Sequence, residues 1–186
     1  MFVKVCGLTN QDQVESLDSM VEYVGFIFYP HSKRHIETPP SSSKAKRVGV
    51  FVDELLAEIQ SKIETHQLDY VQLHGDEDLA YCTKLNGIVS VVKVFRVGAL
   101  VPNMDGFDQV TDYFLFDTDS HLYGGSGQHF NWEIIKNHTM AKPYFLSGGI
   151  GPNDIKGLEV MLTTKAGKQL LAVDLNSQFE IRPGNK

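Results

Sequence analysis

The sequence predicts an α/β protein of the (β/α)8 or TIM barrel class, in which eight parallel strands alternate with helices. Short apolar segments recur along the whole chain, and there are eight of them. Each is followed by turn residues and then by a polar or amphipathic segment of helical character. Several of the apolar segments are almost continuously apolar, which is typical of strands buried on both faces of a parallel sheet. Eight strand–helix pairs favour a closed barrel over an open doubly wound sheet.

The expected strands are short and rich in Val, Ile, Leu and Phe. They cover residues 3–6, 23–29, 47–52, 70–74, 88–95, 113–117, 143–147 and 169–174. The first strand turns through Gly7, and Thr9 or Asn10 can cap the helix that follows it.

Helical character is clearest in five of the intervening segments. They cover residues 10–21, 54–66, 77–86, 131–137 and 152–162. In the second segment Leu55, Ile59 and Ile63 recur at helical spacing and would cover the sheet. Asp76 is the expected N-cap of the third segment, and Pro152 suits the first turn of the last one.

Two parts of the barrel are expected to be incomplete. The second helix is shortened to residues 39–46, which open with two prolines and three serines. The last strand is followed only by residues 175–186, which are too polar and too few for a closing helix. We therefore expect a small barrel whose eighth helix is apparently missing. Truncation, natural absence and supply by a second chain all remain open.

Composition limits the class of protein. The 186 residues, of which 42% are apolar, suffice for one sizeable core, and no linker divides them, so we expect a single domain over residues 1–186. A net charge of −6 argues against a nucleic-acid partner but permits a phosphorylated small molecule. The chain shows no signal peptide and no long apolar run, so we expect a soluble, cytoplasmic protein without membrane contact. Its two cysteines give no disulfide framework, and its histidines form no metal-ligand cluster.

Reactive side chains collect where the expected strands end, which is where barrel enzymes carry their chemistry. They are Cys6, Arg34, His74, Asp117 and Asp174. Each has a simpler explanation: a small buried apolar residue, a surface cation, a turn residue or a cap. Their common location at one end of the strands favours a functional site over these separate explanations.

Lys4 and Cys6 share one face of the first strand, because side chains alternate along a strand. A cation beside a thiol favours the thiolate, so we expect positive surroundings to lower the pKa of Cys6. We also expect Lys4 to pair with Asp174, since the last strand adjoins the first once the barrel closes.

A phosphate site is expected after the seventh and eighth strands. Gly148 and Gly149 follow the seventh strand and precede a helix, so their N–H groups can bind a phosphate. Asn176 and Ser177 would supply neighbouring donors. A Gly-Gly pair can also be a plain tight turn, and it matches no dinucleotide or Walker motif.

Several motifs together resemble those of the phosphoribosylanthranilate isomerase family, in the right order and over essentially the whole chain. They are the segments at 4–9, 25–30 with 32–34, 71–75, 117–118, 123–127 with 130–132, 146–149 and the segment around Asp174. The resemblance implies isomerisation of N-(5-phosphoribosyl)anthranilate to 1-(2-carboxyphenylamino)-1-deoxyribulose 5-phosphate in tryptophan biosynthesis, without a cofactor, by a monomer or homodimer.

The resemblance also implies roles for individual residues. Asp117 would be the acid that opens the sugar ring, and Cys6 the base that removes the C2′ proton. Arg34 would bind the anthranilate carboxylate, since a guanidinium matches a carboxylate. The glycines of the 123–127 loop, Gly124 and Gly125, would close over the sugar, and His74 would lie near the substrate.

One residue departs from the family pattern, because Gln178 stands where the family usually has a glycine. It leaves the roles of Asn176 and Ser177 in phosphate binding less well supported. Another phosphate-binding barrel enzyme is a competing interpretation. It could be a sugar-phosphate epimerase, disfavoured by the absent metal ligands, or the next enzyme of the pathway, disfavoured by the lack of a strand-end lysine acid. A third interpretation is a catalytically idle barrel that binds a phosphorylated metabolite or packs on a partner protein.

Overall fold

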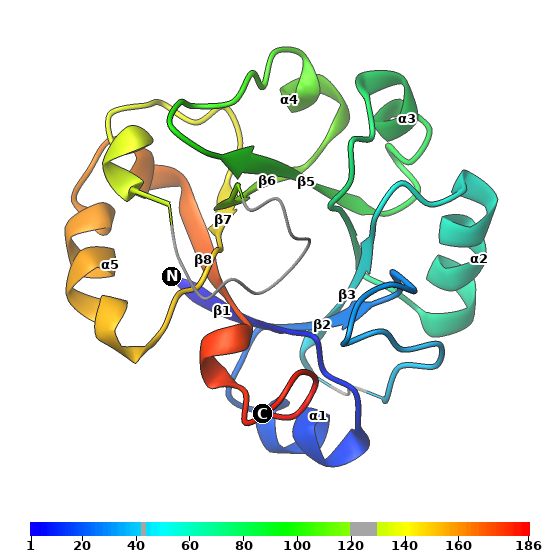
Figure 1. Cartoon of the computed structure of the whole chain (residues 1–186). Coiled ribbons are helices and arrows are strands. Elements are labelled where there is room, and N and C mark those ends of the chain that lie inside the picture. Colours follow the sequence, from blue (N-terminus) through cyan, green and yellow to red (C-terminus); the bar gives the residue numbers. More distant parts are fainter. Residues whose placement is uncertain (42–43, 120–129) are drawn as a thin grey trace.

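A computed structural model of the chain, which describes residues 1–41, 44–119 and 130–186, contains a closed barrel of parallel strands (Figure 1). The strands are β1 (Phe2–Cys6), β2 (Tyr23–Ile27), β3 (Lys46–Phe51), β4 (Tyr70–Leu73), β5 (Ser90–Val97), β6 (Tyr113–Thr118), β7 (Tyr144–Leu146) and β8 (Leu170–Leu175). They neighbour one another in chain order, and β8 closes the ring by pairing with β1. The predicted fold class is confirmed.

Short helices connect most of the strands on the outside of the ring (Figure 1). The α-helices are α1 (Gln11–Leu17), α2 (Leu56–His66), α3 (Leu79–Thr83), α4 (Phe107–Val110) and α5 (Ile155–Leu162). The 3-10 turns are η1 (Trp132–Ile134), η2 (Pro152–Asp154), η3 (Ala166–Gln169) and η4 (Ser177–Phe179). Within the described residues that follow β8, η4 is the single helical turn, as expected from the polar tail.

The start of α1 is as predicted, because the side chain of Asn10 accepts a hydrogen bond from the N–H of Gln13 at 3.0 Å. The cap of α3 is not the expected Asp76 but Asp78, which accepts from the N–H of Tyr81 at 2.7 Å. The intervening Glu77 accepts a hydrogen bond from the N–H of Gly75 at 3.2 Å.

The connection between β2 and β3 differs from the expected short helix. In the described residues of the 39–46 range the backbone is not helical. Arg47 instead donates to the carbonyl of Pro40 at 2.7 Å, and Asp18 accepts from the N–H of Lys44 at 3.0 Å. These contacts satisfy two backbone groups of an irregular segment. The predicted helix at 131–137 is likewise reduced to η1, and the short α4 was not predicted.

The interior of the barrel is apolar near the amino ends of the strands and polar near their carboxyl ends. Tyr23 packs edge-on against Tyr70 and Phe145, with ring centroids 5.4 and 5.2 Å apart. The polar side chains above this layer are Lys4, Gln72, His74, Asp117 and Asp174. Two further apolar clusters fill the space between the sheet and the outer helices. Among the described residues no helix is long and apolar enough to cross a membrane.

Candidate active site

Cys6 and Asp117 lie at the same end of the barrel. Cys6 is the last residue of β1, and Asp117 is the last but one of β6. Because all eight strands are parallel, both residues are at the carboxyl end of the ring. The side chain of Asp117 is 22% exposed, whereas Cys6 is only 4% exposed.

The fit around Cys6 depends on a glycine of the neighbouring strand. Gly25 of β2 is the register partner of Cys6, and a Cβ atom built at Gly25 would lie 2.7 Å from the sulfur. A glycine at this position therefore leaves room for the thiol between the two strands.

A chain of polar contacts runs across the barrel interior from β8 to β6. Lys4 Nζ donates to Asp174 Oδ2 at 2.8 Å and to Gln72 Oε1 at 2.7 Å. Gln72 Nε2 lies 3.0 Å from His74 Nδ1, and His74 Nε2 lies 3.2 Å from Asp117 Oδ2. The expected pairing of Lys4 with Asp174 is confirmed. Since β1, β4 and β6 are not neighbours in the ring, these contacts must pass through its centre.

Gln72 is the member of this chain that sequence analysis missed. It is 2% exposed and lies on β4, two residues before His74, which directly follows that strand, so both side chains face the interior. A glutamine in a strand otherwise made of Val, Leu and Tyr was the available signal, because a buried amide requires partners.

The thiol of Cys6 is not activated in the expected direction. Burial raises the pKa of Cys6, and this effect exceeds the opposing effect of the Lys4 and Lys186 ammonium groups. Lys4 remains a cation, because Asp174 and Cys6 raise its pKa by more than burial lowers it. The expectation that positive surroundings lower the pKa of Cys6 is right about the contribution of Lys4 and wrong about the net shift.

Arg34 lies beside the end of β1, where a Cβ atom at Gly7 would be 2.7 Å from its Cδ. Its Nε and Nη2 donate to the carboxylate of Glu180 at 2.8 and 2.6 Å. The Lys186 ammonium binds the same carboxylate at 3.1 Å. Sequence analysis gave Glu180 no role. Because Glu180 takes one edge of the guanidinium, the edge formed by Nη1 and Nη2 is the one that faces no carboxylate in the described structure.

The turn after β7 has the backbone geometry expected of a glycine pair. Gly148 and Gly149 have φ angles of +90° and +68°, in the left-handed region. A Cβ atom at Gly148 would lie 2.2 Å from Thr118 Oγ1, so the turn also packs closely against the end of β6. In the described part of the chain neither glycine N–H donates a hydrogen bond.

The loop after β8 lies next to this turn. Asn176 and Ser177 follow β8 directly, and the side chain of Gln178 packs on Gly151, 3.2 Å from a Cβ atom built there. Gln178 therefore joins the two loops that were expected to bind phosphate. Gly124 and Gly125 fall in the segment 120–129, outside the described residues.

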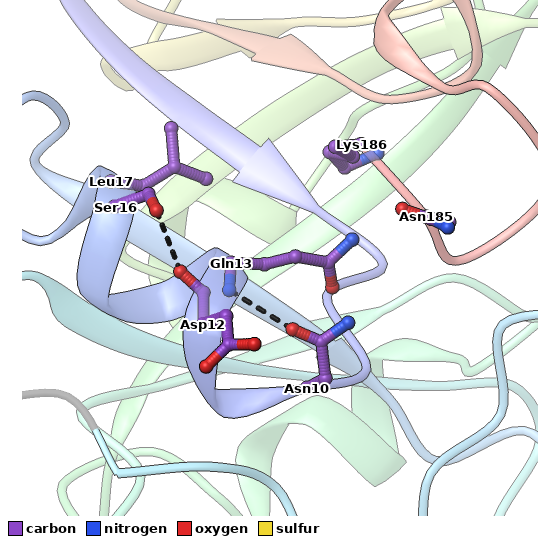
Figure 2. A pocket seen from close by; sticks show the side chains of 7 residues that line it. All are labelled: Asn10, Asp12, Gln13, Ser16, Leu17, Asn185 and Lys186. Carbon is purple, nitrogen blue, oxygen red and sulfur yellow. Dashed lines mark hydrogen bonds between the residues drawn. The ribbon is translucent and has the colours of Figure 1, made fainter.

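A separate groove of 440 Å³ runs along α1 (Figure 2). Its lining comprises Asn10, Asp12, Gln13, Ser16, Leu17, Asn185 and Lys186. The segment after β8 lies beside α1 in Figure 1, and the carbonyl of Gly184 accepts from Thr9 at 2.6 Å. Neither Cys6 nor Asp117 lines this groove, so it is not the candidate active site.

A parallel barrel with a thiol, a carboxyl and a glycine turn at the carboxyl ends of its strands defines a (β/α)8-barrel enzyme of the acid–base class. Comparison with known proteins identifies the family within this class. Residues 3–186 match the family model described as N-(5'phosphoribosyl)anthranilate (PRA) isomerase. The chain belongs to the N-(5'-phosphoribosyl)anthranilate isomerase family.

Individual relatives agree with the family model. The N-(5'-phosphoribosyl)anthranilate isomerase of Parabacteroides distasonis is 35% identical over 100% of this chain and 88% of its own. The isomerase of Phocaeicola vulgatus is 36% identical over 100% of this chain and 92% of its own. The crystal structure of the Thermotoga maritima isomerase covers 100% of this chain and 92% of that one, with 33% identity and a TM-score of 0.82. A further isomerase structure, 31% identical with a TM-score of 0.77, was solved in complex with reduced 1-(o-carboxyphenylamino)-1-deoxyribulose 5-phosphate; it covers 100% of this chain and 92% of that one.

Proposed function

We propose that the chain isomerises N-(5'-phosphoribosyl)anthranilate to 1-(2-carboxyphenylamino)-1-deoxyribulose 5-phosphate, an aldose–ketose isomerisation of tryptophan biosynthesis, with Asp117 as acid and Cys6 as base. The observation that carries the proposal is the position of these two groups at one end of a closed barrel, on β6 and β1. The protein acts as a single domain over residues 1–186, in the cytoplasm, as a monomer or homodimer.

The reaction needs one proton donor and one proton acceptor. Asp117 gives its proton to the ring oxygen of the furanose, the C1′–O bond breaks, and the anthranilate nitrogen forms a Schiff base with C1′. Cys6, as thiolate, then removes the proton from C2′, and the electron pair moves into an enolamine that becomes the ketone. No electron leaves the substrate, since oxidation at C2′ balances reduction at C1′.

The thiolate that this scheme requires is the less favourable protonation state of Cys6. Burial raises the pKa of Cys6, so the free site holds mostly thiol at neutral pH. The Lys4 and Lys186 ammonium groups oppose this shift and stabilise the thiolate when it forms.

Binding is divided between the two ends of the substrate. The Nη1 and Nη2 groups of Arg34 bind the anthranilate carboxylate while Glu180 holds the other edge of the guanidinium. The N–H groups of Gly148 and Gly149, with Asn176 and Ser177, bind the phosphate.

The sugar lies between the two bound groups. Asp174 Oδ1 is buried and has no hydrogen-bond partner among the described residues, so it can accept from a sugar hydroxyl. His74 lies beside Asp117.

A direct assay tests the proposal. Chemically made phosphoribosylanthranilate is added, and the loss of anthranilate-type fluorescence is followed for the wild-type chain, Cys6→Ala and Asp117→Asn. We expect turnover by the wild type and strong loss in both variants. A folded wild-type chain without turnover would identify an idle barrel, and unchanged variants would exclude these two residues from the chemistry.

A further inference from the structure

Gln72 lies at the centre of the interior chain of polar contacts, although no hydrogen bond joins it to Cys6 or Asp117 among the described residues. Its amide lies between the Lys4 ammonium on one side and the His74 ring on the other, at 2.7 and 3.0 Å. It is 2% exposed, so water cannot replace either contact at low cost.

The direction of each hydrogen bond follows from the chemistry of Lys4. An ammonium group has only donors, so the atom of Gln72 that faces it must be the carbonyl oxygen. The NH₂ group of Gln72 must then face His74 Nδ1, which has to accept. An imidazole nitrogen that accepts carries no proton, so the proton of a neutral His74 is on Nε2. Nε2 is the ring nitrogen that lies 3.2 Å from Asp117 Oδ2.

The same arrangement opposes a second proton on the ring. An imidazolium would direct Nδ1–H against the NH₂ group of Gln72, donor against donor. Gln72 cannot turn its amide round to accept, because its carbonyl would then leave the buried Lys4 ammonium without this partner. We propose that Gln72 is a positioning residue that fixes His74 as the neutral Nε2–H tautomer and so sets which form of the ring lies beside the carboxyl of Asp117.

This inference rests on the proposed role of Asp117 as the acid. The carboxyl of Asp117 accepts a hydrogen bond from the N–H of Thr118 at 2.8 Å, and His74 Nε2 lies 3.2 Å from its other oxygen. Neutral donors stabilise the carboxylate left behind after the proton is given up. An imidazolium would make a charge-assisted bond of roughly twice the strength. It would hold Asp117 as a carboxylate from the start, and the site would lack its acid.

The substitution Gln72→Glu tests the idea with little change in shape. A glutamate at this position accepts both from Lys4 and from His74 Nδ1–H, so the ring takes a second proton and lies between two carboxylates. The matched control is Gln169→Glu, which adds the same charge at an exposed residue just before the amino end of β8.

The primary measurement is ¹⁵N NMR of histidine-labelled protein, with the His74 signals assigned by a His74→Asn sample. For the wild type near neutral pH we expect an unprotonated Nδ1 and a protonated Nε2. For Gln72→Glu we expect both nitrogens to be protonated, and for Gln169→Glu the wild-type pattern. A wild-type His74 with its proton on Nδ1, or on both nitrogens, overturns the proposal even if the glutamate variant does not fold.

The kinetic measurement separates positioning from structure. We expect Gln72→Glu to lower kcat by about 10-fold to 100-fold with little change in KM, since orientation of the acid and not substrate binding is affected. Unchanged kcat in a variant whose ring has become an imidazolium overturns the catalytic part of the proposal. An inactive wild type with the predicted tautomer would instead count against the proposed function alone.

Discussion

Lys4 of β1 and Asp174 of β8 form a buried ion pair, 2.8 Å between Nζ and Oδ2, at the seam where the barrel closes. The two residues are register partners on adjacent strands, and their side chains are 1% and 6% exposed. The pair therefore joins the first strand to the last and places a cation near the sulfur of Cys6 at the same time.

Replacing Lys4 by Met should change both the stability of the fold and the pKa of Cys6. It leaves Asp174 and Gln72 without their buried donor, and removal of one partner from a buried pair costs about 3–5 kcal/mol. It should also raise the pKa of Cys6 further, because the Lys4 ammonium opposes the effect of burial. Denaturant unfolding and direct titration of the thiol measure the two effects.

Lys46→Met is the control for this substitution. Lys46 pairs with Asp69 at 3.0 Å, but its side chain is 58% exposed, and such surface pairs contribute about 0–1 kcal/mol. A thiol pKa unchanged by Lys4→Met would show that this cation has no influence on Cys6.

The barrel fold was predictable because the sequence repeats the same pattern, an apolar segment followed by turn residues and a helical segment. Eight separate strands each gave an apolar segment, so an error at any one of them would not have changed the fold class. The short connections were less predictable. Four residues at Phe107–Val110 are too few for helical periodicity. The hydrogen bond from Arg47 to the carbonyl of Pro40 holds part of the β2–β3 connection, and no local pattern indicates it.

The location of Cys6 and Asp117 at one end of the barrel was predictable, because strand position alone decides it. The site was not predictable where the partner is remote in the chain. Glu180 meets Arg34 from 146 residues away, and Gln72 meets Lys4 from 68 residues away. The net pKa shift of Cys6 depends on how deeply the folded chain buries the thiol, which the neighbouring Lys4 does not indicate.

Removing either proposed catalytic group should lower kcat without unfolding the barrel. For Cys6→Ala and for Asp117→Asn we expect a decrease of roughly 10²–10⁴-fold, the usual contribution of a positioned acid or base. Steady-state kinetics measure it, and circular dichroism checks the fold. A loss of less than about tenfold in either variant would mean that another group performs that step.

Arg34→Ala should raise KM more than it lowers kcat, because the guanidinium is proposed to bind the part of the substrate that does not react. Glu180 would then be left buried with Lys186 as its remaining cation, so some loss of stability is expected as well. Glu180→Gln is the comparison variant, since it releases Arg34 without removing it. A large fall in kcat at unchanged KM in Arg34→Ala would assign Arg34 to the chemistry.

The buried Cys82 should make the protein less stable in alkali. Burial raises its pKa from 9.0 to about 11, so the folded chain keeps a proton that the unfolded chain releases. Where the unfolded state binds fewer protons, the free energy of unfolding falls as pH rises. We therefore expect a decline that starts near pH 9 and levels off near pH 11. Urea unfolding across this range measures it, and Cys82→Ala should show a shallower decline; an equal decline would assign the effect to other groups.

The glycine turn after β7 offers a matched pair of substitutions. Gly148 and Gly87 have similar φ angles, +90° and +80°, so alanine costs a comparable backbone strain of about 1–2 kcal/mol at both. They differ in their surroundings: a Cβ atom at Gly148 would lie 2.2 Å from Thr118 Oγ1, whereas one at Gly87 meets nothing within 4 Å. Gly148→Ala should therefore displace the turn from β6, raise KM through the proposed phosphate site and destabilise the chain more than Gly87→Ala, whose KM should equal that of the wild type. Steady-state kinetics and denaturant unfolding of the two variants test this, and equal KM values for both would remove the turn from the binding site.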